Sequence, residues 1–596
     1  DAQSWKDSLM NASFLFTKYL TGLRVGGLFG LVLLGVSLGA CQTSEQENIT
    51  PISPVSFDSI REQTDSSPSF AGQFLAARHA QQLQDNAAAS RFFSEALRLG
   101  NTDEILLKYS FINHYQNGTL GEAIRLARTF ERLGFDFGLA AEPAIAKAVQ
   151  DKDWQALIAL SEKIEISDDF HILAGGLRSL SYIGLGEPET ALGIFHELED
   201  FAELSEGTPE TVLLLLGGYI FELLGNKADS ESYFRQALAK SQDEYIVICA
   251  GAGLWRLGKK TEAEALWQTR LPADVAPLSL VANMQAQTSP AFNAPNLAEL
   301  IARFMFDTSW LSNDSYHSNL LIARAHLAIF ISPELYIAHM ALAEWYLKAE
   351  DYPRARHHLQ KIDEKAPVFL RSRIFMLALE ERSGRAKKAL HTLEAELAPG
   401  ADVTPSIAAE RALLAQVGGD MLRQTEECAR ALDFYQMSLD YGMKSYRLYR
   451  SIGICHEHIG NDPQAEKALL RAIDLNPNDA ISLNYLGYWW ADEGRYLEQA
   501  ITYIKKAVQL QPNSGYYADS LGWVYYRQGQ FDKAVLWLEK AIQLTPTDAV
   551  ISEHLGDAYW QTGRLNEARF KWQHALDMGI DEARVPMIKV KLEKGL

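Results

Sequence analysis

The stretch from Tyr517 to Gly529, Tyr-Ala-Asp-Ser-Leu-Gly-Trp-Val-Tyr-Tyr-Arg-Gln-Gly, has a close copy upstream, where residues 484–494 are Asn-Tyr-Leu-Gly-Tyr-Trp-Trp-Ala-Asp-Glu-Gly. Small residues and prolines extend this copy into a repeat with a period of 34 or 35 residues. Four columns share the period: Gly453, Gly487, Gly522 and Gly556; Ala465, Ala500, Ala534 and Ala568; Ala472, Ala507, Ala541 and Ala575; and Pro477, Pro512 and Pro546. A fixed period of this length predicts a repeat architecture in which each unit packs on its neighbours.

The pattern resembles the tetratricopeptide repeat (TPR), in which each unit is a pair of antiparallel helices. Glycine costs about 1 kcal/mol relative to alanine inside a helix. Its recurrence at the eighth position, as at Gly522, therefore indicates that the first helix must approach its neighbour closely. Large residues such as Leu538 and Trp572 fill the remaining space, and Gly529 supplies the turn between the helices. The resemblance implies an all-α, right-handed solenoid of about a dozen helix pairs, some of them degenerate.

One segment, from about residue 271 to 296, breaks the period. It holds four prolines, which cannot continue a helix, and it predicts an irregular junction. We therefore expect a degenerate N-terminal array over 70–270, an irregular junction with a degenerate repeat over 271–335, a C-terminal array over 336–582 and a capping helix over 583–596. A cap is expected because the last unit of a solenoid needs a polar outer face.

The first 40 residues have the parts of a secretory signal. Lys18 and Arg24 precede an almost wholly apolar run over 25–37, which is shorter than the roughly 20 residues of a membrane-spanning helix. The run ends in Leu-Gly-Ala-Cys at 38–41, which resembles the bacterial lipobox. This resemblance implies a signal peptide over 1–40, with Met10 as the start of translation, and lipid attachment at Cys41. An ordinary signal peptide that a cysteine happens to follow is the alternative.

The residues after the cysteine predict where the chain is sorted and predict a disordered tether. By the same resemblance, a residue other than aspartate at Gln42 implies sorting to the outer membrane of a Gram-negative cell, facing the periplasm. Residues 41–69 are rich in Ser, Thr, Gln, Asn and Pro, a composition that predicts a disordered tether. Each acyl CH₂ that enters the bilayer contributes about 0.8 kcal/mol, so a lipidated cysteine would anchor the chain firmly.

The net charge and the motif content argue against catalysis and against nucleic-acid binding. The net charge of −20 repels a phosphate backbone. The run 253–260 is close to a phosphate-binding loop but lacks its final Ser or Thr and the preceding strand. The run Cys-His-Glu-His at 455–458 does not converge on a four-ligand metal site from one helix. We predict a chain that is not an enzyme and that has no cofactor, no metal and no catalytic residues.

A protein-binding groove is expected on the first helices of the repeats. In TPR proteins the concave groove is lined by positions 2, 5, 9, 12 and 13 of these helices, and aromatic and arginine side chains are enriched at binding hot spots. Carried onto the last four repeats, these positions predict a groove of Arg447, Arg450, Glu457, His458, Asn484, Tyr488, Asp492, Tyr516, Asp519, Trp523, Tyr526, Arg527, Glu553, Asp557 and Trp560. Packing of several of them against neighbouring helices or the capping helix is the alternative.

The runs 484–494 and 517–529, together with the lipobox and the tether, resemble a group of proteobacterial TPR outer-membrane lipoproteins. These are the lipoprotein partners of the periplasmic carboxyl-terminal processing protease (the LbcA/NlpI type). The resemblance implies an adaptor that binds this protease and brings cell-wall hydrolases to it. Two alternatives stay open: a scaffold for an outer-membrane, secretion or polysaccharide-export complex, and an enzyme or sugar binder. The oligomeric state is not predicted.

Overall fold

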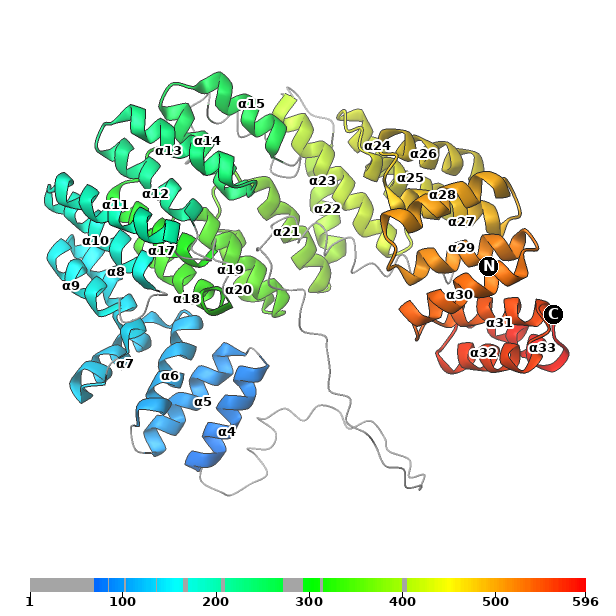
Figure 1. Cartoon of the computed structure of the whole chain (residues 1–596), viewed down its shortest axis with the longest axis horizontal. Helices are drawn as coiled ribbons and strands as arrows, with labels where there is room; N and C mark the ends of the chain where they lie inside the picture. Colours follow the sequence, from blue (N-terminus) through cyan, green and yellow to red (C-terminus); the bar gives the residue numbers. More distant parts are fainter. Residues whose placement is uncertain are drawn as a thin grey trace. The chain divides into compact units, whose positions relative to one another are not determined.

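The computed structural model describes residues 69–83, 85–100, 103–135, 137–164, 170–204, 210–271, 284, 293–310, 315–398 and 405–596. Within these residues the chain forms 29 α-helices and no strand, and it divides into two compact units at Ser383/Gly384. Figure 1 labels the helices in chain order. The predicted signal peptide, Cys41 and the tether lie outside the described residues. None of the described helices is both long enough and apolar enough to cross a membrane.

The N-terminal unit consists of antiparallel helix pairs. Its helices are α4 (Phe70–Gln82), α5 (Asn86–Leu99), α6 (Glu104–Gln116), α7 (Leu120–Leu133), α8 (Glu142–Asp151), α9 (Trp154–Ile164), α10 (His171–Leu185), α11 (Pro188–Leu204), α12 (Glu210–Leu223), α13 (Lys227–Lys240), α14 (Glu244–Arg256), α15 (Lys260–Arg270), α17 (Leu297–Trp310), α18 (Ser315–Ile331), α19 (Tyr336–Lys348), α20 (Tyr352–Leu359) and α21 (Phe369–Arg382), with a short 3₁₀ helix at Gly138–Ala141.

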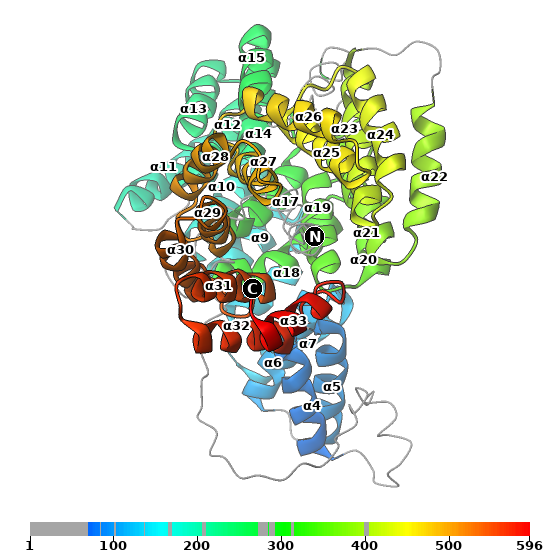
Figure 2. The same cartoon turned by 90° about the vertical axis from the view of Figure 1, so that its right-hand side faces the viewer.

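The C-terminal unit continues the pattern with more regular repeats. Its helices are α22 (Ala386–Leu397), α23 (Pro405–Gln424), α24 (Cys428–Asp440), α25 (Tyr446–His458), α26 (Asp462–Leu475), α27 (Ala480–Asp492), α28 (Leu497–Leu510), α29 (Gly515–Arg527), α30 (Phe531–Leu544), α31 (Ala549–Gln561), α32 (Leu565–Asp577) and α33 (Val585–Lys594). Figure 2 shows the pairs α27/α28, α29/α30 and α31/α32 in succession, with α33 beside α32. One continuous apolar core runs through them from Ile454 to Ile588.

The recurring glycines sit where each first helix crosses its partner. A Cβ added at Gly522 would lie 2.5 Å from Leu538, and one added at Gly556 would lie 2.5 Å from Trp572. These distances are too short for any other residue to fit without displacing the partner side chain. The expected reason for the glycine column is therefore confirmed. The turn glycines are confirmed too, because Gly529 has a φ of +73°, in the region that favours glycine.

The one-residue insertion in the period lies in a turn. Three residues separate α29 from α30, whereas four residues, 493–496, separate α27 from α28. The additional residue lets Tyr496 adopt a φ of +46° immediately before α28. The inserted residue thus leaves the two helices and their packing unchanged.

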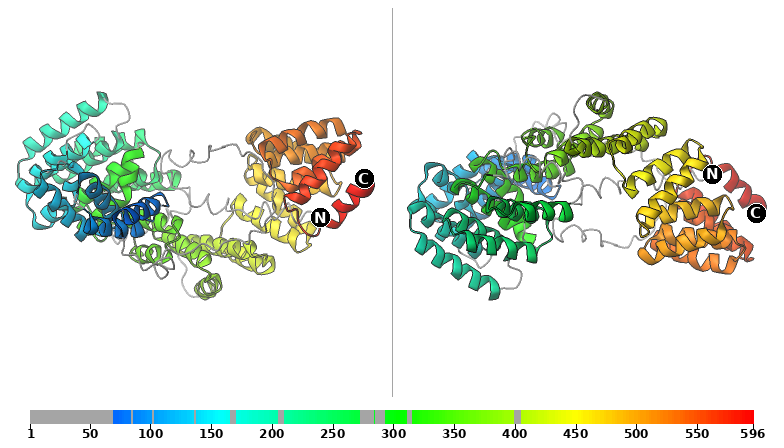
Figure 3. Two further views of the ribbon diagram at one scale, coloured as in Figure 1. Left: turned by 90° about the horizontal axis from the view of Figure 1, so that it is seen from below. Right: turned by 90° about the horizontal axis from the view of Figure 1, so that it is seen from above.

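Most of the predicted proline-rich junction, residues 272–283 and 285–292, lies outside the described residues, and the pair α17/α18 follows it in the span where a degenerate repeat was expected. Helix α17 packs against α10 and α12, and α18 packs against α6 and α8. Figures 1 and 3 show these green helices beside the cyan ones. A Cβ at Gly176 of α10 would lie 2.2 Å from Phe304 of α17, so this glycine permits the approach. Residues 336–383, which the sequence analysis assigned to the C-terminal array, group with the N-terminal unit in the structure.

A buried ion pair holds α18 to the first half of the unit. Arg324 donates to Glu142 from Nη2 at 2.6 Å and from Nε at 3.1 Å, and both side chains are 0% exposed. Tyr115 of α6 also donates to Glu142, at 2.7 Å. Arg324 further donates to Ser309 at the end of α17, at 2.9 Å. Helices α6 and α8 therefore meet α17 and α18, which lie far from them in sequence, at one charged pair.

We predict that Arg324→Met lowers the free energy of unfolding of the N-terminal unit by about 3–5 kcal/mol, because it leaves the Glu142 carboxylate buried without its cation. Adding Glu142→Gln should recover part of this loss. The measurement is urea unfolding of the full chain, followed by circular dichroism. Arg125→Met, which removes a solvent-exposed pair with Glu122, is the control and should have little effect. Equal effects of the two substitutions would contradict the prediction.

Candidate protein-binding surface

The structure places every predicted groove residue on the first helix of its repeat. We call this set the helix-A face. It comprises Arg447, Arg450, Glu457 and His458 on α25; Asn484, Tyr488 and Asp492 on α27; Tyr516, Asp519, Trp523, Tyr526 and Arg527 on α29; and Glu553, Asp557 and Trp560 on α31. Each helix starts from a well-defined cap, such as Asp479 for α27 and Asp548 for α31, so equivalent positions recur in register.

Burial divides the helix-A face into two groups. Seven side chains are buried: Arg450, Asn484, Tyr488, Asp519, Trp523, Glu553 and Asp557. Arg447 is exposed, and seven are half-buried: Glu457, His458, Asp492, Tyr516, Tyr526, Arg527 and Trp560. The predicted groove is thus corrected in part, because side chains such as Tyr488 and Trp523 pack inside the repeats, as the alternative had it. Tyr516, Tyr526 and Trp560 keep some surface that a partner can contact.

The buried group forms a network that joins three repeats. His554 Nδ1 lies 3.0 Å from a carboxylate oxygen of Asp519, and its ring stacks on Trp523 with 4.1 Å between centroids. Trp523 stacks in turn on Tyr526 at 4.9 Å and donates from Nε1 to Asp492 at 3.2 Å. Helices α27, α29 and α31 are therefore fixed relative to one another, and the exposed edge of Tyr526 is held in place.

His554 was not among the predicted residues. It occupies the sixth position of its helix, one residue beyond Glu553, and faces the previous repeat. The available signal was the separation of 35 residues between Asp519 and His554, which is one repeat plus one residue. A side chain at the sixth position thus reaches the fifth position of the preceding repeat.

A second polar link joins the repeat that begins with α25 to the repeat that begins with α27. Arg450 of α25 donates to Asp479 at 2.7 Å, and Asp479 also accepts from the backbone N–H of Ser482 at the start of α27. Further along the same two helices, Tyr485 donates to Glu457 at 3.0 Å. Arg450 is consequently committed to holding the repeats together, while Arg447, three residues earlier, stays at the surface.

The last repeat contains a cluster of charges. Lys591 of α33 donates to Glu553 Oε1 at 2.8 Å, to Asp557 Oδ1 at 2.8 Å and to Asp557 Oδ2 at 2.7 Å. Arg584 pairs with Glu553 Oε2 at 2.9 Å. Burial raises the pKa of Glu553, but Lys591 and Arg584 outweigh it and leave that pKa below its usual value. Burial lowers the pKa of Lys591 less than the two carboxylates raise it, so the net shift is upward.

No cluster of three or more His, Cys, Asp or Glu side chains suited to a metal ion occurs in the part of the chain that the structure describes. Cys249, Cys428 and Cys455 are buried free cysteines inside helices. The run 253–260 spans the turn from α14 to α15. The helix-A face combines polar and aromatic side chains on rigidly stacked helices, and such a face suits the binding of another protein.

Fold and site together define an all-α solenoid of TPR repeats. Family models for TPR repeats match residues 459–515 and 522–576. These matches span α26 to α32 except for the first part of α29, and they leave out α25, which carries the first four residues of the helix-A face.

Two relatives of known name share part of the sequence. The TPR repeat-containing protein PA4667 of Pseudomonas aeruginosa is 42% identical over 67 residues, which are 11% of this chain and 11% of that protein. The Photosystem I assembly protein Ycf3 of Rippkaea orientalis is 34% identical over 115 residues, which are 16% of this chain and 65% of that protein. The chain thus spans about a tenth of the first relative and just under two thirds of the second.

The chain is also similar to several solved structures, three of which follow. The Cut9–Hcn1 heterotetramer of the APC/C matches 88% of this chain and 96% of that one, at 14% identity and a TM-score of 0.30. Pseudomonas aeruginosa PilF matches 31% of this chain and 85% of that one, at 17% identity and a TM-score of 0.28. YrrB, described as a TPR protein with an unusual peptide-binding site, matches 37% and 92%, at 20% identity and a TM-score of 0.22.

We predict that Trp523→Ala lowers the free energy of unfolding of the C-terminal unit by about 3 kcal/mol, because it removes the stack with His554 and Tyr526 and leaves a cavity. Arg447→Ala, an exposed change on the same face, should alter it by less than about 0.5 kcal/mol. Urea titration of the full chain, monitored by circular dichroism, measures both. A neutral Trp523→Ala would show that the ring is not part of the packed network.

Proposed function

We propose that this chain is a lipid-anchored adaptor of the bacterial envelope that binds a periplasmic carboxyl-terminal processing protease and presents cell-wall hydrolases to it. The TPR repeats support the general part, because such repeats are non-catalytic scaffolds for protein–protein interaction. The lipobox-like run at 38–41 supports the anchor at Cys41 and a place on the periplasmic side of the outer membrane. The resemblance of the runs 484–494 and 517–529 supports the protease adaptor.

One observation of the fold carries the binding proposal. The helix-A face combines the half-buried aromatics Tyr516, Tyr526 and Trp560 with the exposed Arg447 and the half-buried Arg527, on the first helices of three of the four repeats. Binding hot spots use these residue types when they are held rigidly and flanked by groups that exclude water. The buried network of Asp519, His554 and Trp523 provides that rigidity, because it fixes the helices that carry the exposed groups.

The test is a crosslinking pull-down from membranes with the Cys41-anchored full chain. We expect the wild type to recover a carboxyl-terminal processing protease and wall hydrolases. Tyr516→Ala/Tyr526→Ala should reduce recovery of at least one of the two by about tenfold or more, since truncating two hot-spot aromatics costs at least about 1.4 kcal/mol of binding. These half-buried rings are better probes than Trp523, whose removal would disturb the fold.

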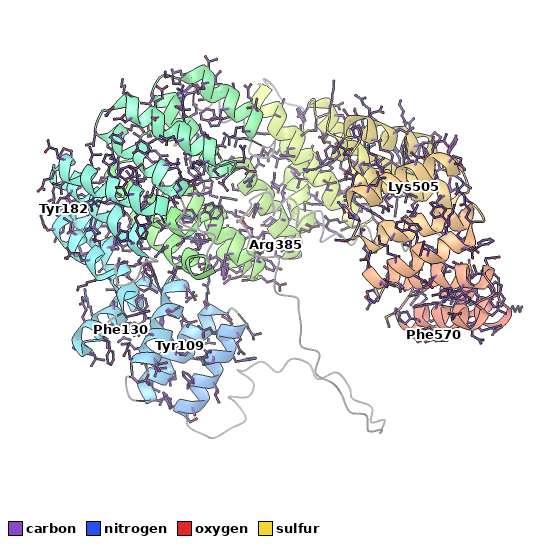
Figure 4. All side chains as sticks on the ribbon, viewed as in Figure 1. Tyr109, Phe130, Tyr182, Arg385, Lys505 and Phe570 are labelled. Atoms are coloured by element: carbon purple, nitrogen blue, oxygen red, sulfur yellow. The ribbon has the colours of Figure 1, made fainter. Side chains whose placement is uncertain are left out.

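Phe570→Ala is the matched control, because Phe570 is an aromatic residue 66% exposed on α32, a second helix of its pair (Figure 4). Equal losses in both variants would contradict the helix-A face as the binding site. Recovery of an envelope assembly complex without a protease would favour the scaffold alternative. A Cys41→Ser variant should leave the membrane fraction if the lipid is the anchor.

A further inference from the structure

The end of the chain covers the last part of the helix-A face. Of the ten residues of α33, only Ile588 and Lys591 are buried. Met587 and Val590 of the same helix are largely exposed. A helix of ten residues is marginal in isolation, so α33 depends on these two side chains and on its flanks for its position. Val585 and Leu592 pack partly buried against the apolar core. The Leu592 carbonyl oxygen accepts from Arg569 Nε at 3.3 Å, and Arg584 at the start of the helix pairs with Glu553.

The ionic contact of α33 is fully matched. An ammonium group has three N–H donors, and Lys591 Nζ has three carboxylate oxygens within 2.8 Å, one from Glu553 and two from Asp557. Asp557 also accepts from Trp572 Nε1 at 2.8 Å, which fixes its orientation. The site is therefore specific for a lysine through the positions of its three acceptor oxygens as well as through its charge.

The backbone after α33 makes a second contact that depends on its sequence. Gly595 has a φ of +82°, and a Cβ at this position would lie 1.9 Å from Trp560. Only glycine lets the chain pass this close to the ring without displacing it. Glu553, Asp557 and Trp560 therefore form one site, which we call the acidic pocket, with a lysine and a glycine as its occupants.

We propose that the acidic pocket is a docking site for a lysine-bearing helix of a partner protein, and that α33 occupies it in cis as a detachable strap. The inference rests on the proposed function and specifies the chemistry of the partner: a basic, amphipathic helix with a small residue one turn after its lysine. The three pocket residues occupy positions 5, 9 and 12 of α31, which are among the positions of the helix-A face on α25, α27 and α29. A partner lying along that face therefore reaches the strap.

Replacing Lys591 in the acidic pocket by the lysine of a partner is electrostatically more favourable than leaving the pocket without a cation. Burial keeps the pKa of Asp557 above its usual value even with Lys591 in place. Removing the lysine would leave two buried carboxylates facing each other, which is unfavourable. A competing lysine removes this obstacle, because it restores the three hydrogen bonds as α33 leaves.

The test uses the chain's own tail as the probe. A fluorescent peptide of residues 583–596, with a blocked N-terminus, is titrated into the full chain and into Lys591→Met, and binding is followed by anisotropy. The peptide should bind Lys591→Met at least about tenfold more tightly than the wild type, because the wild-type strap competes at an effective concentration in the millimolar range. Asp557→Asn added to Lys591→Met should abolish the binding, as should methionine at the lysine position of the peptide.

Equal binding to the wild type and to Lys591→Met would overturn the proposal, and so would no binding to a folded Lys591→Met. If circular dichroism shows that this variant loses helix, Gly595→Leu displaces the strap through Trp560 and leaves both carboxylates intact, with the same expected outcome. No protease or hydrolase takes part in this experiment. A negative result in the peptide titration therefore does not contradict the adaptor proposal. A negative result in the pull-down likewise does not contradict the proposal for the acidic pocket.

Discussion

Close contact between a glycine of one helix and a large side chain of the next determines the rest of this structure. At Gly453, Gly487, Gly522 and Gly556 an added Cβ would lie 2.5–2.7 Å from Leu469, Ile504, Leu538 or Trp572. Because each crossing has the same depth, successive pairs stack with the same geometry and the apolar core is continuous. The helix-A face follows from this regularity, since equivalent positions of α25, α27, α29 and α31 then point the same way.

Besides the apolar core, polar contacts between buried side chains hold particular helices together. In the C-terminal unit, Arg450 pairs with Asp479 and His554 contacts Asp519, so each link joins consecutive repeats. In the N-terminal unit, Glu142 and Arg324 join helices that are 182 residues apart. A buried pair of this kind contributes little net stability but penalises any packing that separates its members. These pairs therefore specify which surfaces meet.

The sequence predicts the fold well where the repeat is regular. The glycine and alanine columns place the helices from α25 to α32, and the turn that contains Tyr496 absorbs the inserted residue. It predicts α17 and α18 poorly, because their position depends on contacts such as Phe304 with Gly176 that have no period along the chain. On the helix-A face, the positions were predictable but the burial was not. Whether Trp523 is exposed depends on His554, which lies in the next repeat.

We propose that the helix-A face of the C-terminal unit is the surface that binds partner proteins. Hydrogen exchange of the full chain, alone and bound to the protein recovered with it, tests this claim most directly. We expect slower exchange in α25, α27, α29 and α31, which carry the face, and unchanged exchange in α26, α28, α30 and α32. Protection confined to the second helices or to the N-terminal unit would contradict it.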